Sequence, residues 1–190
     1  MITAIDFETA NYSDASICAV GIATFEETGE LLESFHSLVR PPKGHGWFRE
    51  EFIECHGIHP WDVWDEPEFP SLAEELTGRI RRSSLVIAHN AAFDMRKLKG
   101  TLAHFGLPCP EFNYLCTLHA ARKIWPGLQG YGLGSLAARI GHIFCHHNAQ
   151  DDAEAAGRLL YALMQSSESP NLNSMIESIG LTVLRCTQAN

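Results

Sequence analysis

The sequence predicts an α/β fold built on a mixed five-stranded sheet with helices on its faces. Two observations support this prediction. The first 40 residues contain three runs with the apolar pattern of β-strands, and after residue 70 helix-like segments alternate with short apolar runs. Three strands linked by hairpins, followed by alternating helices and strands, predict three antiparallel strands and then two parallel ones.

The N-terminal part supplies the three antiparallel strands. Two of the runs alternate with period two, and the middle one is apolar and rich in strand formers. The three runs are residues 2–8, 17–25 and 31–39. The tetrapeptide 27–30, Glu-Thr-Gly-Glu, predicts a hairpin turn between the second and third strands. Segment 41–70 holds prolines, glycines and three of the four tryptophans, so we expect a loop with a short helix near residues 49–54.

The rest of the chain predicts helices that alternate with two strands. Ser71 and Glu74 have the spacing of a capping box, which starts a helix that runs to Arg82. Residues 85–88 are a short apolar run, as in a strand buried on both faces. The later elements follow from apolar spacing and from breaker residues. They are a helix over 91–105, a strand over 112–116, and helices over 118–124, 133–140 and 150–165.

The length of 190 residues fits one domain followed by a tail. We expect a catalytic domain over residues 1–166. The tail, residues 167–190, begins with a polar linker and continues with the pattern of a short helix and of an extra strand.

The composition is that of an ordinary globular protein, with 45% apolar and 19% charged residues. No apolar run approaches the roughly 20 residues that span a bilayer, and no secretory signal is visible, so we expect no membrane partner. The six cysteines are dispersed without a Cys-x-x-Cys pair, which indicates reduced thiols in the cytoplasm. The formal net charge of −9 disfavours an extended duplex-binding surface but allows an enzyme that grips only a strand end.

Four carboxylates are directed inward by the local periodicity. Asp6 and Glu8 are two residues apart on a strand expected to be central, so they share one face. Asp94 lies in the first turn of its helix, in register with the apolar stripe, where the helix dipole tolerates a negative charge. On the last helix Asp152 aligns with apolar positions, whereas Asp151 aligns with exposed ones and fits an ordinary first-turn acid.

The convergence of these acids predicts bound cations. Any one of them alone is more simply an ordinary surface residue, but several inward carboxylates without partners are costly. Without mating lysines or arginines on those faces, and with only oxygen ligands, the pattern favours Mg²⁺ or Mn²⁺. We expect two ions, because two cations about 4 Å apart can activate a water and stabilise a leaving oxygen in phosphoryl transfer. His147, in the loop that precedes Asp152, is the predicted proton acceptor for that water.

Three motifs carry a family resemblance: Asp6-x-Glu8, then Asn90-x-x-Phe-Asp94, then His147-x-Ala-x-x-Asp152. In this order and spacing, over residues 2 to about 165, the chain resembles the DEDDh exonucleases. That DnaQ-like superfamily includes the proofreading epsilon subunit of the bacterial replicative DNA polymerase.

The resemblance implies a ribonuclease H-like fold and a metal-dependent 3′–5′ exonuclease that releases nucleoside 5′-monophosphates. It also implies that Glu51 and His56 touch the terminal nucleotide, with Thr9 near it. Asn90, at the exit of a strand, is a further candidate for substrate binding.

The predicted substrate is the 3′ end of a single-stranded nucleic acid, with DNA favoured over RNA, in proofreading or repair. The alternatives are an exoribonuclease of the same superfamily and a catalytically silent module that binds nucleic acid or protein. The complete set of five catalytic residues argues against silence. A polymerase partner is compatible with the resemblance but is not indicated, because the tail does not resemble the segment that tethers the replicative subunit.

Some histidines and cysteines allow a second interpretation. His89 could contact substrate, or it could cap the end of a strand through hydrogen bonds. Neighbouring cysteines and histidines at 55–56, 116–119 and 145–147 suggest zinc, but no two of these groups make a familiar four-ligand spacing, so we expect no zinc site.

Aromatic and basic residues also leave alternatives open. Three tryptophans could stack nucleobases, but we favour a role in covering the edge of the core. They are Trp47, Trp61 and Trp64. Three basic residues lie mostly off the apolar stripe of the helix over 91–105 and could steer a phosphate backbone or form a solvated face. They are Arg96, Lys97 and Lys99.

Overall fold

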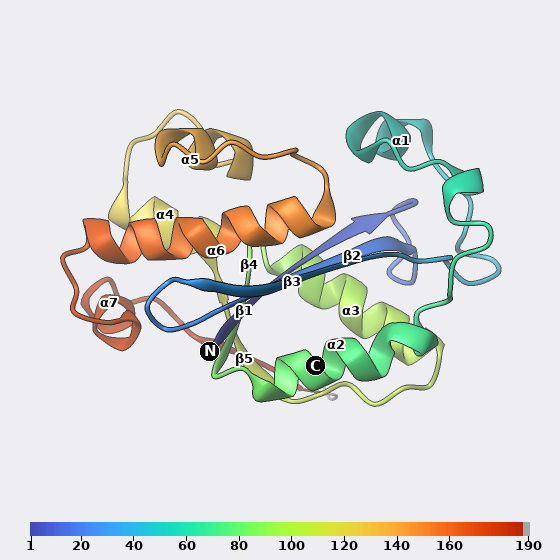
Figure 1. Cartoon of the computed structure of the whole chain (residues 1–190), viewed down its shortest axis with the longest axis horizontal. Helices are drawn as coiled ribbons and strands as arrows, with labels where there is room; N and C mark the ends of the chain where they lie inside the picture. Colours follow the sequence, from blue (N-terminus) through green and yellow to red (C-terminus); the bar gives the residue numbers. More distant parts are fainter. Residues whose placement is uncertain (188–190) are drawn as a thin grey trace.

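The computed structural model describes residues 1–187 and is built around one mixed sheet (Figure 1). Its strands are β1 (Ile2–Thr9), β2 (Ile17–Phe25), β3 (Leu31–Leu38), β4 (Leu85–Ala88), β5 (Phe112–Cys116) and β6 (Leu184–Cys186). Their order in the sheet is β3-β2-β1-β4-β5-β6. β1 pairs antiparallel with β2 and parallel with β4, and β4 pairs parallel with β5. The predicted fold class and the central place of β1 are therefore confirmed.

The sheet has six strands, one more than the five predicted. The sixth, β6, comes from the tail and pairs antiparallel with β5, with Phe112 opposite Cys186. It is only three residues long and its first two residues are exposed. The tail pattern suggests an extra strand, but its pairing with β5 joins distant segments, and a local pattern does not show such a contact.

Helices cover both faces of the sheet. They are α1 (Glu50–His56), α2 (Pro70–Arg82), α3 (Ala92–His104), α4 (Thr117–Ile124), α5 (Leu133–Arg139), α6 (Ala149–Ser166) and α7 (Leu172–Ser178), with a 3-10 turn at Pro60–Asp62. Figure 1 shows α4, α5 and α6 on one side of the sheet, α2 and α3 on the other, and α1 beside one end. Within residues 1–187, no helix is both long and apolar enough to cross a membrane.

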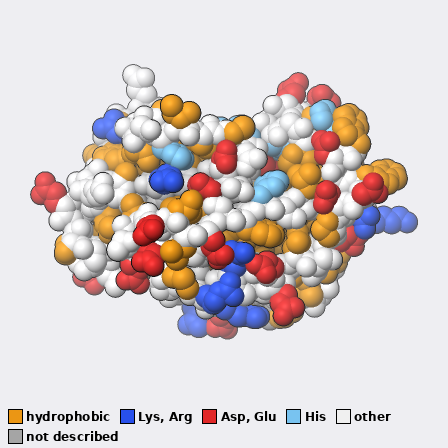
Figure 2. Space-filling view, viewed as in Figure 1, with side chains coloured by type: hydrophobic (Ala, Val, Ile, Leu, Met, Phe, Trp, Pro, Cys, Tyr) orange, Lys and Arg blue, Asp and Glu red, His pale blue; other side chains and the backbone are white. Residues whose placement is uncertain are grey.

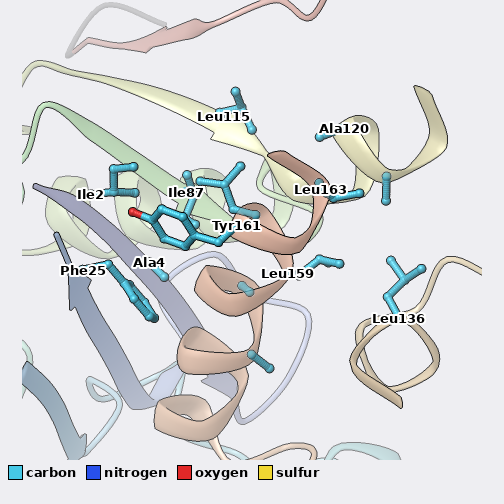
Figure 3. Packing of buried hydrophobic residues seen from close by; sticks show 14 of the residues in the cluster. Ile2, Ala4, Phe25, Ile87, Leu115, Ala120, Leu136, Leu159, Tyr161 and Leu163 are labelled. Carbon is cyan, nitrogen blue, oxygen red and sulfur yellow. The ribbon is translucent and has the colours of Figure 1, made fainter. Parts of the chain in front are cut away.

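The alternation of β1 divides the core into two layers. Ile2 and Ala4 belong to the layer under α6, whereas Ile5 and Phe7 belong to the layer that faces α2 and α3. Figure 3 shows the first layer, in which side chains from β1, β2, β4 and β5 point toward α6. Because Asp6 continues the register of Ile2 and Ala4, its side chain emerges on the α6 side of the sheet.

Two glycines allow α6 to lie unusually close to the sheet. A Cβ atom at Gly21 would stand 1.9 Å from the carbonyl oxygen of Ala149, the first residue of α6. A Cβ atom at Gly157 would stand 2.0 Å from the ring of Phe25. Gly21 is the partner of Asp6 across the β1–β2 pair. The N-terminus of α6 is therefore pressed against the strand pair that carries Asp6.

The predicted capping box at the start of α2 is wrong. The helix begins at Pro70 after Phe69, without a side-chain cap, and Ser71 lies inside the first turn. Phe69 is buried in the core, and proline fits the first turn of a helix because it needs no backbone N–H there. Burial of Phe69 and the conformation of Pro70 thus fix the helix start one residue before the sequence pattern suggests.

The close approach at Gly21 yields a testable expectation. Gly21→Ala should force α6 away from β2 and lower the free energy of unfolding by about 1–3 kcal/mol, the usual cost of overpacking. Urea denaturation followed by circular dichroism measures this change. Gly130→Ala is the matched control, because nothing lies within 4 Å of a Cβ atom there. Equal stability of the two variants would show that α6 can relax without cost.

Candidate active site

Three carboxylates from two elements meet at the end of β1. Asp6 and Glu8 project from β1, and Asp152 projects from the first turn of α6. One oxygen of each lies within 4.8 Å of the others. Asp152 is buried, whereas Asp151 is partly exposed and accepts a hydrogen bond from the backbone N–H of Cys145. The register of α6 thus directs Asp152 inward, as its alignment with apolar residues predicts.

Asp94 approaches from the opposite layer. It lies in the first turn of α3, is 2% exposed, and is followed on the same face by the buried Leu98 and Leu102. Its carboxylate receives a backbone hydrogen bond at Phe7, which ties it to β1. Its Oδ1 is buried without a hydrogen-bond partner in the described part of the chain. An unsatisfied carboxylate oxygen in such a place fits a site that takes a cation.

Burial and mutual repulsion raise the pKa values of these acids and disfavour their ionised forms. Burial, and then the charge of Asp152, raise the pKa of Asp6 well above its usual range. Burial, followed by Asp6 and Asp152, raises the pKa of Glu8 to about 9. The pKa of Asp94 is raised by burial and by Asp6, against backbone hydrogen bonds that lower it. A divalent cation reverses this balance because it stabilises the ionised form of every ligand.

His146 and His147 stand over Asp152 from the loop that enters α6. His146 Nδ1 lies 2.7 Å from Asp152 Oδ1, and the backbone N–H of His147 donates to Asp152 Oδ2 at 2.7 Å. The two imidazole rings stack with their centroids 3.9 Å apart. His147 has φ of +67°, a conformation that bends the chain into the helix. Burial, and then the charge of His146, lower the pKa of His147, which keeps its ring neutral and able to accept a proton.

A cavity of about 200 Å³ joins these groups. It is lined by acidic and histidine side chains together with three apolar residues. The lining residues are Asp6, Phe7, Glu8, His89, Phe93, Leu133, His146, His147 and Asp152. The cavity thus brings four of the five predicted catalytic residues to one surface, and Asp94 is not among its lining residues.

The four residues predicted to touch substrate are not among those that line this cavity. His56, on α1, has Nε2 3.1 Å from the carbonyl oxygen of the buried Thr9, and its Nδ1 accepts from the backbone N–H of Ile58. Glu51 is exposed on α1 and pairs with Arg49 at 2.6 Å. Asn90 is exposed in the loop between β4 and α3, with φ of +68°. The fold joins Thr9 to His56 directly, Glu51 shares α1 with His56, and Asn90 comes from a separate loop.

His89 has the structural role that the sequence left as one alternative. Its Nδ1 lies 2.9 Å from Thr117 Oγ1, and its Nε2 donates to the carbonyl oxygen of Tyr131 at 2.9 Å. Both ring nitrogens are therefore engaged at the end of β4, although one side of the ring still lines the cavity.

The expectation that Lys97 lies on the surface of its helix is wrong. Lys97 is fully buried instead of lying on a solvated face, and its Nζ donates to the carbonyl oxygens of Asn11, Tyr12 and Ser13 at 3.3, 3.1 and 2.6 Å. The amine is satisfied by backbone oxygens from a distant loop, which the helix pattern cannot reveal.

The three tryptophans do not cover the edge of the core. Their exposed fractions are 55%, 69% and 72% for Trp47, Trp61 and Trp64. Figure 2 shows apolar and acidic side chains next to one another on the side of the molecule where α1 lies. Phe69 and Val63 are the apolar residues of this segment that reach the core, because they are buried while the tryptophans are not.

Comparison with known proteins identifies the family. Residues 3–160 match the Exonuclease family of the RNase T type. The chain belongs to the exonuclease family. It is 36% identical over 173 residues to DNA polymerase III PolC-type of Streptococcus suis, which covers 90% of this chain. It is 29% identical over 140 residues, 73% of the chain, to the 3′-5′ exonuclease DinG of Bacillus subtilis. The chain spans only 12% and 15% of the lengths of these two relatives.

Solved structures of exonucleases share the fold. Exonuclease X in complex with 5′ overhanging duplex DNA superposes with a TM-score of 0.73 at 25% identity, covering 95% of this chain and all of that one. The nuclease domain of 3′hExo, a DEDDh family member bound to rAMP, gives a TM-score of 0.74 at 15% identity, covering 96% of this chain and 95% of that one. The predicted ribonuclease H-like fold and the DnaQ-like 3′–5′ exonuclease superfamily are therefore confirmed, and the predicted hydrolase class is confirmed at the level of this family.

The raised pKa of Glu8 predicts how the stability of the metal-free protein depends on pH. Folding raises this pKa from 4.5 to about 9, so the folded state holds the proton more tightly than the unfolded chain. The resulting stability is full below pH 4.5 and is lost as the pH rises toward 9. In EDTA we expect a loss of at least about 1 kcal/mol over this window, the equivalent of one pKa unit, and recovery on addition of Mg²⁺.

Chemical denaturation at a series of pH values measures this loss. Glu8→Gln should weaken the pH dependence in EDTA, because the neutral amide removes one of the titrating groups. Glu50→Gln, on an exposed residue of α1, should leave it unchanged. The prediction fails if Glu8→Gln and the parent lose the same free energy between the two pH limits.

Proposed function

We propose that this chain is a divalent-metal-dependent 3′–5′ exonuclease that acts on the 3′ ends of single-stranded nucleic acid and releases nucleoside 5′-monophosphates. The observation that carries the proposal is the meeting of Asp6, Glu8 and Asp152 within 4.8 Å. Asp94, with its unsatisfied buried Oδ1, completes a set of four oxygen ligands. Oxygen donors of this kind suit Mg²⁺ or Mn²⁺.

The four carboxylates would hold two such ions, which when bound supply Lewis acidity to the attacked phosphate and to the leaving oxygen. The chain's own contribution is to position these ligands and to take up a proton. His147 directs Nδ1 toward Cys55 at 3.3 Å, and we assign Nε2 as the atom that accepts the proton of the attacking water. The lowered pKa of His147 favours this role, because the ring is neutral before the reaction.

Substrate contacts are proposed for Thr9, Glu51, His56 and Asn90, which come from β1, α1 and the loop between β4 and α3. The backbone hydrogen bonds of His56 fix its ring at the base of α1, so the ring can support a terminal sugar or base without reorganising. A net charge of −9 favours a grip on one strand end over a grip on an extended duplex.

DNA is favoured over RNA by the relatives with higher identity. The PolC-type protein, at 36% identity, has a DNA polymerase name, and Exonuclease X, at 25% identity, was solved with DNA. The neighbours that carry rAMP or a histone mRNA stem-loop are 15% and 14% identical and support the fold alone. We therefore place the activity in DNA proofreading or repair, within a catalytic domain over residues 1–166.

Removal of one ligand should abolish hydrolysis. Asp152→Asn preserves shape but removes a charge, and we expect the rate to fall by more than roughly 100-fold, because even an outer partner of a metal ligand contributes about 10–100-fold. The assay follows monophosphate release from single-stranded DNA with Mg²⁺, and EDTA provides the blank. An RNA of the same sequence is tested in parallel and is expected to be hydrolysed more slowly.

Asp151→Asn is the matched control for this assay, because it changes the neighbouring acid, which faces away from the site. It should stay within about twofold of the parent, as surface substitutions do. Absence of monophosphate from the parent would favour a silent binding module, and faster release from RNA would favour an exoribonuclease.

Loss of the proposed base should slow chemistry while metal binding persists. His147→Ala should lower kcat by about 10²–10⁴-fold, the usual contribution of a general base. His119→Ala, on an exposed position of α4, is the control. Mg²⁺ affinity, measured by calorimetry, should be nearly unchanged in both variants. A parallel loss of kcat and of Mg²⁺ affinity in His147→Ala would identify His147 as a ligand instead of the base.

A further inference from the structure

A second group of metal-ligating side chains overlaps the carboxylate site. His146, His147 and Asp152 each place one donor atom within 4.8 Å of the donor atoms of the other two. A fourth donor, the Sγ atom of Cys55 on α1, lies 3.3 Å from His147 Nδ1 but outside the group of three donors that are within 4.8 Å of one another. These donors are two imidazoles, one carboxylate and one thiol, in contrast to the oxygen-only set formed by Asp6, Glu8 and Asp152.

We propose that His146, His147, Asp152 and Cys55 form an inhibitory Zn²⁺ site. Imidazole and thiolate donors favour zinc over magnesium, and four ligands match the tetrahedral preference of zinc. The zinc site itself stands on these four side chains, whereas its inhibitory effect rests on the proposed exonuclease function.

The donors come from two segments that are far apart in the sequence. Cys55 lies on α1, and the other three donors lie just before α6 or in its first turn. Cys55 and His147 are 92 residues apart in the sequence. No familiar zinc spacing exists along the chain for this reason. The fold forms the set by bringing α1 over the loop that enters α6.

Three of the four donors are already close together, and the fourth requires α1 to move Cys55 toward them. His146 Nδ1 and Asp152 Oδ1 are already 2.7 Å apart, so a zinc ion would replace the proton shared between them. Cys55 is exposed, and α1 contributes no buried residue to the core, so a small shift of this helix toward the two histidines costs little packing.

Zinc at this place would oppose catalysis in two ways. Asp152 belongs to both donor groups, so zinc would take a ligand away from the magnesium site. The lone pair of the neutral His147 ring would coordinate zinc, so the ring could no longer accept a proton from water. Zinc would also tie α1 to the loop before α6 and narrow the entrance to the cavity.

Co²⁺ and Zn²⁺ binding to the full chain tests the site without any nuclease assay. With metal-free, reduced protein, we expect tetrahedral Co²⁺ absorption together with a thiolate-to-cobalt charge-transfer band, both lost on addition of Zn²⁺. Cys55→Ser should lose the charge-transfer band, and His146→Asn should weaken zinc binding by more than the roughly 10–100-fold that an outer partner contributes. Cys145→Ser is the matched control, since Cys145 is also an exposed thiol but is not one of the four proposed ligands.

The inhibitory effect is measured separately. The rate of Mg²⁺-dependent hydrolysis is recorded at increasing Zn²⁺ concentrations, and the rate of each variant is divided by its own rate without zinc. Parent and Cys145→Ser should be inhibited at the same zinc concentration. Cys55→Ser and His146→Asn should need at least about tenfold more, in line with their weaker binding.

The outcomes separate this inference from the proposed function. A parent chain that fails to bind Zn²⁺ in the micromolar range, or a charge-transfer band that depends on Cys145, would overturn the zinc site. Equal inhibition of parent and Cys55→Ser would overturn its regulatory role. A Cys55-dependent cobalt band in a chain that releases no monophosphate would support the zinc site and refute the exonuclease proposal.

Discussion

The contact between the first turn of α6 and the bare backbone of Gly21 is the constraint on which the site depends. With no side chain at Gly21, the carbonyl of Ala149 rests directly on β2, opposite the position where Asp6 lies on β1. Asp152 follows three residues later and therefore faces Asp6 and Glu8, with one oxygen of each within 4.8 Å of the others. Asn148 caps the helix by accepting from the backbone N–H groups of Gln150 and Asp151, which fixes where α6 begins.

The fold stabilises crowded negative charge by directing helix N-termini at it. Asp94 and Asp152 each lie in the first turn of a helix, one from each side of the sheet, where the partial positive charge of the helix dipole is greatest. Backbone hydrogen bonds at Phe7 and His147 add to this stabilisation. Even with these interactions the pKa values of both acids stay raised. Bound cations are therefore needed to stabilise their ionised forms.

The residues that the sequence could assign are those whose orientation follows from local periodicity. The period of a strand places Asp6 and Glu8 on one face, and the period of a helix distinguishes Asp152 from Asp151. Features that depend on distant segments escaped prediction. Lys97 is polar and was expected on a solvated face, because the carbonyls that satisfy it lie 84 to 86 residues earlier in the chain. The pairing of Cys55 with His147 and the pairing of β6 with β5 escaped for the same reason.

The buried lysine connects α3 to the loop after β1 and, through that loop, to α1. Lys97 binds three successive carbonyls of the loop after β1, beginning at Asn11. The side-chain amide of Asn11 in turn donates to the carbonyls of His45 and Trp47, just before α1. The backbone N–H of Arg49, the residue that precedes α1, donates to Ala10 in the same loop. Since α1 has no buried residue of its own, these polar contacts, more than apolar packing, determine where it stands over the carboxylates. The helix that carries Asp94 therefore also sets the position of the helix that carries Glu51, Cys55 and His56.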